Sequence, residues 1–266
     1  MLTLTRNTIK EIRALEQRKS RREQLAWLAE GNKLVGDLLA TFPNSPFRCL
    51  RLVATDEWWQ SHPQYASMAA ECYLATRAEM ERTSLLQTPQ DVLAVFSLPS
   101  PSTDADLAVG SNASTPSLAI LLDEVQDPGN LGTIIRTADW FGVRHIYCSP
   151  GTADCYSPKV VQATMSALAR VRLHYFDTRD DVCQWLQHAD MPIYGTFLDG
   201  TDIYHTTLHS NGILVMGNEG RGISADVAQL VSDRLFIPHF SPDGAHVESL
   251  NVSIATAICL SELRRR

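Results

Sequence analysis

Residues 123–138 carry the first group of side chains that could do chemistry. An apolar run ends there in an acidic, glycine-containing turn, and a helix is predicted to begin near Asn130, a good helix-capping residue. Helical spacing turns Ile134 toward a core and places Arg136 on an outer face with Trp140. An ordinary capped helix with one surface arginine fits this segment as well as a binding site does.

The second group is a glycine-rich segment, Gly217–Gly222, which directly follows an apolar run and contains Glu219. Its three glycines allow the main chain to approach a neighbour closely or to adopt positive φ. The spacing is G-x-x-G-x-G rather than the G-x-G-x-x-G of dinucleotide loops. A turn without a ligand and adenosine binding through main-chain groups both fit this pattern.

The third group, Glu248–Asn251, precedes another stretch with helical periodicity. Ser249 or Asn251 can cap that helix, and alone the segment predicts little more than a cap. His239 and His246 lie in the loop before it, but two histidines without clustered partners do not predict a metal site.

Strands and helices alternate regularly around these groups. Short apolar runs predict strands at Leu118–Leu122, Val143–Cys148, Val171–Tyr175, Ile193–Phe197 and Ile213–Met216. Periodicity predicts helices at Leu131–Phe141, Lys159–Leu168, Arg179–His188 and Val252–Leu263. The alternation predicts an α/β fold with a mainly parallel sheet covered on both faces, in which ligands bind beyond the carboxyl ends of the strands.

The chain is predicted to have two domains. Residues 99–117 are rich in Ser, Pro, Asp and Gly, as linkers are, and separate residues 1–98 from residues 118–266. Helical periodicity at residues 7–19 and 22–41, with strands at Cys49–Ala54 and Val92–Leu98, predicts a small α/β domain before the linker.

Composition excludes several classes of protein. The six cysteines are scattered, which predicts free thiols rather than a disulfide framework or a zinc site. No apolar run is long enough to cross a bilayer and no signal peptide is evident, so we expect a cytoplasmic protein. The formal charge of −7 is unlike a general nucleic-acid binder. Residues 6–22 are nevertheless basic, and with the Arg264–Arg266 tail they could contact phosphates, although a solvated helix face fits equally.

Taken in order, the three groups resemble the signature motifs of the SpoU (TrmH-like) RNA 2′-O-ribose methyltransferases, members of the SPOUT superfamily. The motifs read N-x-G-x-x-x-R-x-A, then G-N-E-G-x-G, then I-P followed by E-S-L-N-V-S-x-A, and they span nearly all of residues 118–266. One departure is a long loop, which places Glu248 ten positions after Pro238 and lacks the usual methionine. Less strongly, Ile12–Arg22 and the region of Glu30 and Gly31 resemble a ribosomal-protein-like RNA-binding domain.

The resemblance implies methyl transfer from S-adenosylmethionine to a ribose 2′-OH of RNA, with ribosomal RNA favoured by the N-terminal domain. It also implies a deep trefoil knot in residues 118–266 and a homodimer with the active site near the subunit interface. By position, it assigns catalysis to Asn130, Arg136, Glu219, Ser249 and Asn251, and cofactor contacts to the main chain near Thr196, Gly217, Ile237 and Leu250. No metal is implied.

A ribose 2′-OH is a very weak acid, so catalysis must orient it and ease the loss of its proton. The guanidinium of Arg136 stays protonated up to a pKa of about 12 or more, so we expect it to stabilise the developing alkoxide rather than act as a base. Asn130 and Asn251 are expected to orient the sugar, and Glu219 to brace Arg136 or the loop. The alternatives are a transfer-RNA 2′-O-methyltransferase, an inactive RNA-binding assembly factor on this fold, and a dinucleotide-dependent dehydrogenase.

Overall fold

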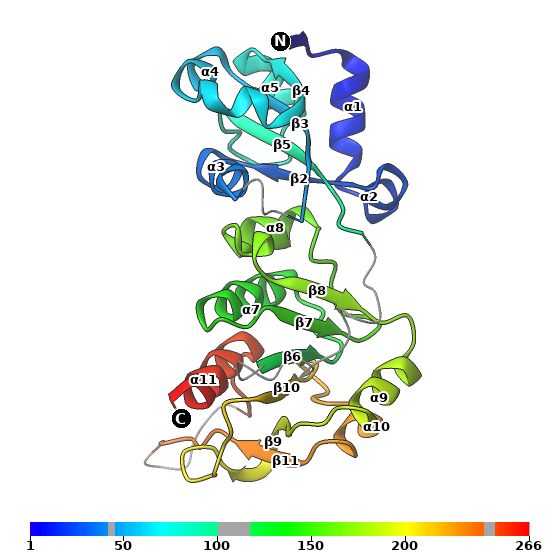
Figure 1. The fold of residues 1–266 in the computed structure, drawn as a ribbon, viewed down its shortest axis with the longest axis vertical. Coiled ribbons are helices and arrows are strands. Elements are labelled where there is room, and N and C mark those ends of the chain that lie inside the picture. Colours follow the sequence, from blue (N-terminus) through cyan, green and yellow to red (C-terminus); the bar gives the residue numbers. More distant parts are fainter. Residues whose placement is uncertain (42–45, 101–117, 242–247, 266) are drawn as a thin grey trace. The chain divides into compact units, whose positions relative to one another are not determined.

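A computed structural model describes residues 1–41, 46–100, 118–241 and 248–265, which pack into two compact units. Unit 1 comprises Met1–Pro101 and Asp154–Arg170, and unit 2 comprises Ser102–Ala153 and Val171–Arg266. Each unit holds a β-sheet with helices on both of its faces (Figure 1). Most of the predicted linker, and His246, lie outside the described residues, and the predicted domain boundaries stay a prediction.

In its described part, unit 2 contains a six-stranded parallel sheet in the order β11-β9-β10-β6-β7-β8. The strands are β6 (Leu118–Leu122), β7 (His145–Cys148), β8 (Arg172–Tyr175), β9 (Ile193–Asp202), β10 (Gly212–Met216) and β11 (Asp233–Phe236). Every residue of β6 and β10 is buried, because helices cover both faces of the sheet. The predicted mainly parallel α/β architecture is confirmed.

The helices of unit 2 are α7 (Pro128–Trp140), α9 (Arg179–Gln187), α10 (Ala225–Ala228) and α11 (Val252–Arg265). Helices α7 and α11 lie on one face of the sheet and α9 and α10 on the other (Figure 1). Ala119 and Leu121 pack with Val182 of α9, so the alternating side chains of β6 turn Ile120 toward α7 and α11.

Two features of this sheet were missed by the sequence analysis. The short elements β11 and α10 are not among the predicted strands and helices. Strand β9 runs past the predicted end at Phe197, because β11 pairs first with Tyr194 and Gly195 and then with Thr201 and Asp202. The residues between those two pairs leave the ladder, and such an excursion has no periodic signal.

Within its described part, unit 1 has a five-stranded mixed sheet in the order β1-β4-β3-β5-β2. The strands are β1 (Leu2–Thr3), β2 (Ala26–Glu30), β3 (Cys49–Ala54), β4 (Ala69–Leu74) and β5 (Val92–Ser97). The helices are α1 (Arg6–Ala14), α2 (Arg18–Gln24), α3 (Asn32–Ala40), α4 (Asp56–Ser61), η1 (Pro63–Ser67), α5 (Arg77–Thr83), α8 (Pro158–Thr164) and η2 (Ala167–Ala169).

The helix predicted over residues 22–41 is confirmed only at its two ends, in α2 and α3, and is wrong between them, where the chain forms β2. Leu25 has a left-handed conformation (φ 49°) that ends α2, and Gly31 (φ 109°) starts the turn into α3. Between these two breaks, β2 pairs with β5 and is buried along its whole length, so tertiary packing overrides a helix-like apolar spacing.

Segment Asp154–Arg170 packs within unit 1 although it lies between β7 and β8 in sequence. The buried guanidinium of Arg21 donates to a carboxylate oxygen of Asp154 at 2.6 Å. The side chain of Gln162 on α8 donates to the carbonyl oxygen of Glu30 at 2.8 Å. Unit 1 is therefore built from two separate stretches of the chain.

The basic residues of the N-terminal arm divide into two kinds. Arg21 is buried and also donates to the carbonyl of Leu15, so it cannot reach a phosphate as had been expected. Arg6 and Lys10 are exposed and lie four residues apart on α1, whereas the guanidinium of Arg13 donates to the carbonyl oxygens of Arg82 at 3.1 Å and Ser84 at 2.7 Å.

All six cysteines lie within the described residues, and none of them forms a disulfide there. No helix in the described ranges is both long and apolar enough to cross a membrane.

Candidate functional site

Three of the five polar residues predicted to act together, Asn130, Glu219 and Asn251, meet at the carboxyl edge of the unit 2 sheet. Neighbouring strands β10 and β6 run parallel and in register, from Gly212 opposite Leu118 to Met216 opposite Leu122. Their following loops, 217–222 and 123–127, therefore leave the sheet side by side. This is the edge at which open parallel sheets bind ligands.

Helix α7 begins earlier than predicted. Asp127 is the residue that caps it, since its side chain accepts a hydrogen bond from the main-chain N–H of Asn130 at 2.8 Å, and proline occupies the first turn. The prediction that Asn130 caps the helix is wrong, because the Asp-Pro pair starts the helix three residues sooner. As a consequence the side chain of Asn130 does not cap α7, and it can form hydrogen bonds with the other two motifs.

Asn251, Asn130 and Glu219 form a chain of side-chain hydrogen bonds. The Asn251 amide donates to Oδ1 of Asn130 at 2.8 Å, and the Asn130 amide donates to Oε1 of Glu219 at 3.0 Å. An ionised carboxylate only accepts, so Glu219 fixes which way the Asn130 amide faces. One residue from each of the three motifs is thus joined in a single network.

Glu219 is also bound to the main chain of the first loop. Its carboxylate accepts from the N–H groups of Gln126 at 3.3 Å and Asp127 at 3.2 Å. Partial desolvation would raise the pKa of Glu219, but the hydrogen bonds from Asn130 and from these main-chain groups outweigh it and hold the pKa below its ordinary value. The carboxylate therefore ties the glycine-rich loop to the 123–127 loop.

Asn251 is the helix cap that the third motif predicted. Its Oδ1 accepts from the main-chain N–H groups of Ser253 at 2.9 Å and Ile254 at 3.4 Å, at the start of α11. Since the same side chain donates to Asn130, the cap links α11 to α7.

Arg136 and Ser249 stand apart from this hydrogen-bonded chain. Both are exposed, and the described residues supply neither with a hydrogen bond or an ion pair. Arg136 lies on the outer face of α7, as its spacing predicted, with Trp140 one turn further along the helix. A guanidinium without a protein partner can receive an anionic ligand.

Three of the residues expected to hold a cofactor lie within or directly after the adjacent strands β11, β9 and β10. Gly217 comes directly after β10, Ile237 directly after β11, and Thr196 at the point where β9 leaves its ladder. Leu250, 47% exposed, precedes α11. A Cβ on Gly217 would lie 2.2 Å from the carbonyl carbon of Gly222, so only glycine allows the loop to fold back this closely.

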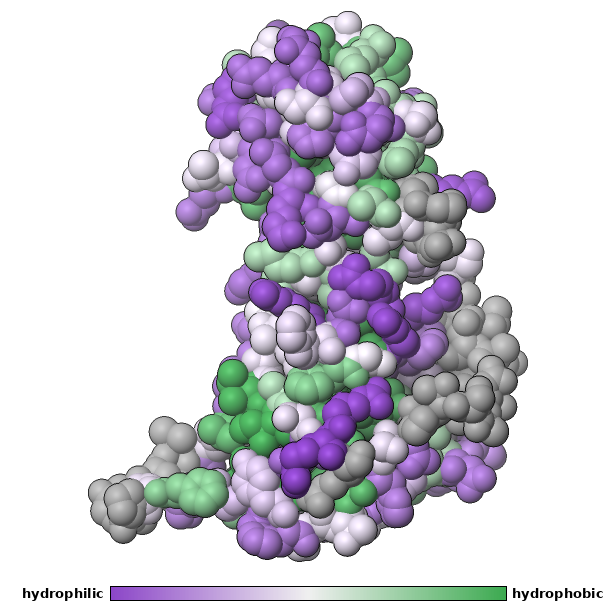
Figure 2. Space-filling model, turned by 60° about the vertical axis from the view of Figure 1, so that its left-hand side comes forward, coloured by the Kyte–Doolittle hydropathy of each residue, from purple (hydrophilic) through white to green (hydrophobic). Residues whose placement is uncertain are grey.

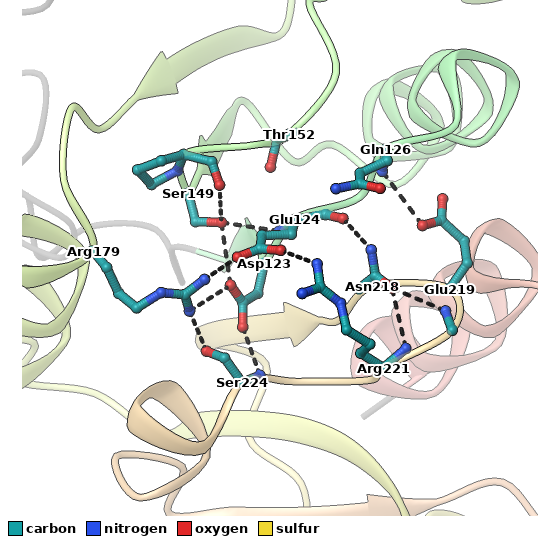
Figure 3. A network of polar contacts seen from close by, with 12 residues as sticks. Asp123, Glu124, Gln126, Ser149, Thr152, Arg179, Asn218, Glu219, Arg221 and Ser224 are labelled. Carbon is teal, nitrogen blue, oxygen red and sulfur yellow. Dashed lines mark hydrogen bonds and ion pairs between the residues drawn. The ribbon is translucent and has the colours of Figure 1, made fainter.

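A second polar network, which the sequence analysis missed, lies beside the first (Figure 3). Asp123, only 1% exposed, accepts from Ser149 Oγ at 3.1 Å, from the Ser224 N–H at 2.8 Å and from Arg179 at 3.2 Å. Glu124 accepts from both Arg179 and Arg221. The acidic pair after a buried strand and the arginine inside the glycine-rich loop were the signals that could have revealed it.

Comparisons with known proteins agree with this geometry. The model of the SpoU rRNA Methylase family matches residues 117–261, and that of the MRM3-like substrate binding domain matches residues 6–94. The structure of a putative RNA methyltransferase of the TrmH family from Porphyromonas gingivalis is 42% identical, with a TM-score of 0.83 and 98% of each chain covered.

Two further proteins match along almost the whole chain. The AdoMet-bound rRNA methyltransferase from Sinorhizobium meliloti is 29% identical, with a TM-score of 0.83, and the match covers 99% of this chain and 97% of that one. The 23S rRNA (guanosine(2553)-2′-O)-methyltransferase RlmP of Bacillus subtilis is 28% identical over 96% of this chain and 95% of its own.

Replacing Glu219 by Gln tests the lowered pKa. The ionised carboxylate stabilises the folded protein above its ordinary pKa of 4.5, and that contribution disappears as the pH falls through the lower folded value. We expect E219Q to be less stable than wild type at about pH 7 and the difference to shrink below about pH 4. Urea denaturation across this range measures it, with the exposed Glu81→Gln as control. A difference that grows in acid would contradict the assignment.

Proposed function

Because the chain belongs to the SpoU rRNA methylase family, we propose that the network at the carboxyl edge of the unit 2 sheet methylates a ribose 2′-OH of ribosomal RNA. The enzyme is an RNA 2′-O-methyltransferase that uses S-adenosylmethionine. The observation that carries the proposal is the hydrogen-bonded chain from Asn251 through Asn130 to Glu219, which unites the three motifs.

The residues expected to hold the cofactor, within β9, directly after β10 and β11 and before α11, have the chemistry that S-adenosylmethionine needs. Main chain near Thr196 and Gly217 offers polar groups for an adenosine, while Ile237 and Leu250 offer apolar contact. When bound, S-adenosylmethionine supplies a methyl group already activated by the positive sulfur, so the protein has only to prepare the nucleophile. We assign the cofactor contacts to these four residues.

Arg136 is the residue assigned to the substrate's reacting end. A permanently charged, exposed guanidinium can bind the phosphate next to the target ribose and stabilise negative charge on the 2′ oxygen as its proton leaves. Asn130 and Asn251 have fixed amide orientations and can hold the sugar hydroxyls, with the hydroxyl of Ser249 nearby in sequence.

Unit 1 is proposed to hold the RNA. Its match to a substrate-binding domain model supports this role, as does the exposed face of α1 that presents Arg6 and Lys10. The relatives named as 23S rRNA methyltransferases favour ribosomal RNA over transfer RNA, and the enzyme is expected to meet that RNA in the cytoplasm.

Two copies of the chain are proposed to associate through unit 2. Trp140 on α7 is 85% exposed and Ile254 on α11 is 51% exposed, and Leu250, 47% exposed, directly precedes α11, so a partner surface here would cover apolar side chains. Figure 2 shows apolar residues gathered on this part of unit 2. Arg136 shares the outer face of α7 with Trp140, so a second copy here would border the site. The trefoil knot stays a prediction.

Replacing Arg136 by Ala should reduce methyl transfer by about a thousandfold or more, the size seen when a group that stabilises developing charge is lost. Binding of S-adenosylmethionine, followed by calorimetry, should persist. The control is Arg144→Ala, which removes an exposed arginine bound to Asp139 in the same unit. Near-normal turnover by R136A would overturn the catalytic role, and loss of cofactor binding would point to misfolding.

Reversing the charges of Arg6 and Lys10 together to Glu should weaken RNA binding by roughly tenfold to a hundredfold at low salt and flatten its salt dependence. Filter binding to ribosomal RNA fragments and to transfer RNA measures the effect and compares the two substrates. The matched control reverses Lys33 and Arg48, exposed bases elsewhere in unit 1. An equal loss in the control pair would show that total charge, not this face of α1, governs binding.

Replacing Trp140 by Glu should convert a dimer into monomers, because an unpaired charge would be buried at the centre of the contact. Sedimentation velocity over a range of concentrations measures the association, with Trp185→Phe as a conservative control outside this face. A wild-type chain that sediments as a monomer would refute the dimer proposal.

A further inference from the structure

Glu124 has an unusual backbone for a glutamate. Its φ is 59°, in the left-handed region that glycine and asparagine prefer, immediately after β6. A glycine there would avoid the steric cost of the left-handed backbone. The glutamate is therefore expected to make side-chain contacts that offset this cost.

The side chain of Glu124 joins two arginines from separate loops (Figure 3). One carboxylate oxygen accepts from Arg179, the first residue of α9, and the other accepts from Arg221 in the glycine-rich loop. Glu124 is only 21% exposed and Arg179 28%, so both are partly shielded from water and salt. Arg179 is held in turn by Asp123 and by the hydroxyl of Ser224.

The main chain of Glu124 holds the same loop. Its carbonyl oxygen accepts from the side-chain amide of Asn218 at 2.9 Å, and its N–H donates to Ser149 Oγ at 2.9 Å. Oδ1 of Asn218 then accepts from the N–H groups of Gly220 and Arg221, at 3.0 and 3.1 Å. The loop is therefore anchored to Glu124 at both Asn218 and Arg221.

Glu219 lies between these two anchors. Two main-chain hydrogen bonds between Asn218 and Gly222, each 2.9 Å, close the loop into a tight turn that presents Glu219 toward Asn130. Gly217, assigned to the cofactor, directly precedes the turn. A shift of the turn would move the cofactor contact and the Glu219 carboxylate together.

We propose that Glu124 is a positioning residue, which fixes the 217–222 turn through Arg221 so that the cofactor contact at Gly217 and the Glu219–Asn130 hydrogen bond form together. This inference rests on the proposed function for the identity of the ligand. It assigns the strained glutamate a role that is separate from folding: a pre-set turn lowers the cost of binding the cofactor.

Glu124→Gly separates positioning from stability. The substitution relieves the left-handed backbone and removes the two ion pairs, so the melting temperature should stay within a few degrees of wild type. The dissociation constant and KM for S-adenosylmethionine should rise about tenfold, and amide hydrogen exchange should accelerate at residues 217–222. Arg221→Ala should reproduce these changes, and the double variant should add less than twofold, because both substitutions break the same contact.

A pair of alanine variants provides the matched control: Glu124→Ala removes the proposed positioning carboxylate, and Glu71→Ala removes a comparable carboxylate elsewhere. Glu71 also accepts from an arginine, Arg51, at 3.2 Å, but in unit 1, so its loss should lower the melting temperature without changing cofactor affinity. Wild-type cofactor affinity together with wild-type exchange of residues 217–222 in Glu124→Gly would overturn the proposal. Failure of the proposed function would show separately, as a wild-type protein that leaves ribosomal RNA unmethylated, and the exchange measurement needs neither RNA nor cofactor.

Discussion

A carboxylate removed from water at the end of a parallel strand needs hydrogen-bond donors from the loops around it. Asp123 is in that position at the end of β6, and its donors come from the loop after β7, from the start of α9 and from the chain just beyond the glycine-rich turn. These loops are far apart in sequence. The need to compensate one buried charge therefore draws together the segments that surround the proposed site.

Two layers of polar contacts follow from this arrangement. The inner layer, around Asp123 and Glu124, is partly buried and binds loop to loop. The outer layer runs from exposed Glu219 through half-buried Asn130 to exposed Asn251, and its side chains can exchange protein partners for a substrate. The inner contacts hold the geometry and leave the outer groups accessible, which is the division that a preorganised active site requires.

The sequence predicted unit 2 well because its signals were local. Apolar runs and helix periodicity located β6, β10 and most of α7, and the three motifs identified residues that do come together. Asn130 does bond to residues of the other two motifs, but it was wrongly assigned to the helix cap, since Asp127 and Pro128 start the helix.

What escaped prediction depends on partners distant in sequence. The strand β2 had helix-like apolar spacing, and only its pairing with β5 makes it a strand. The excursion in β9 depends on β11, and the bridge from Glu124 to two arginines depends on loops that meet only in the folded sheet. No pattern within one segment could disclose these contacts.

The two-part construction of unit 1 bears on how the protein is made. Ribosomes synthesise the chain from its N-terminus onward, and domains ordinarily fold as they emerge from the ribosome. Here the hydrogen bonds from the Arg21 guanidinium to Asp154 and from Gln162 to the Glu30 carbonyl can form only after β6, α7 and β7 have been synthesised. The last contacts of unit 1 therefore become possible only after part of unit 2 has been synthesised, so the two units are completed in an interleaved order rather than one after the other.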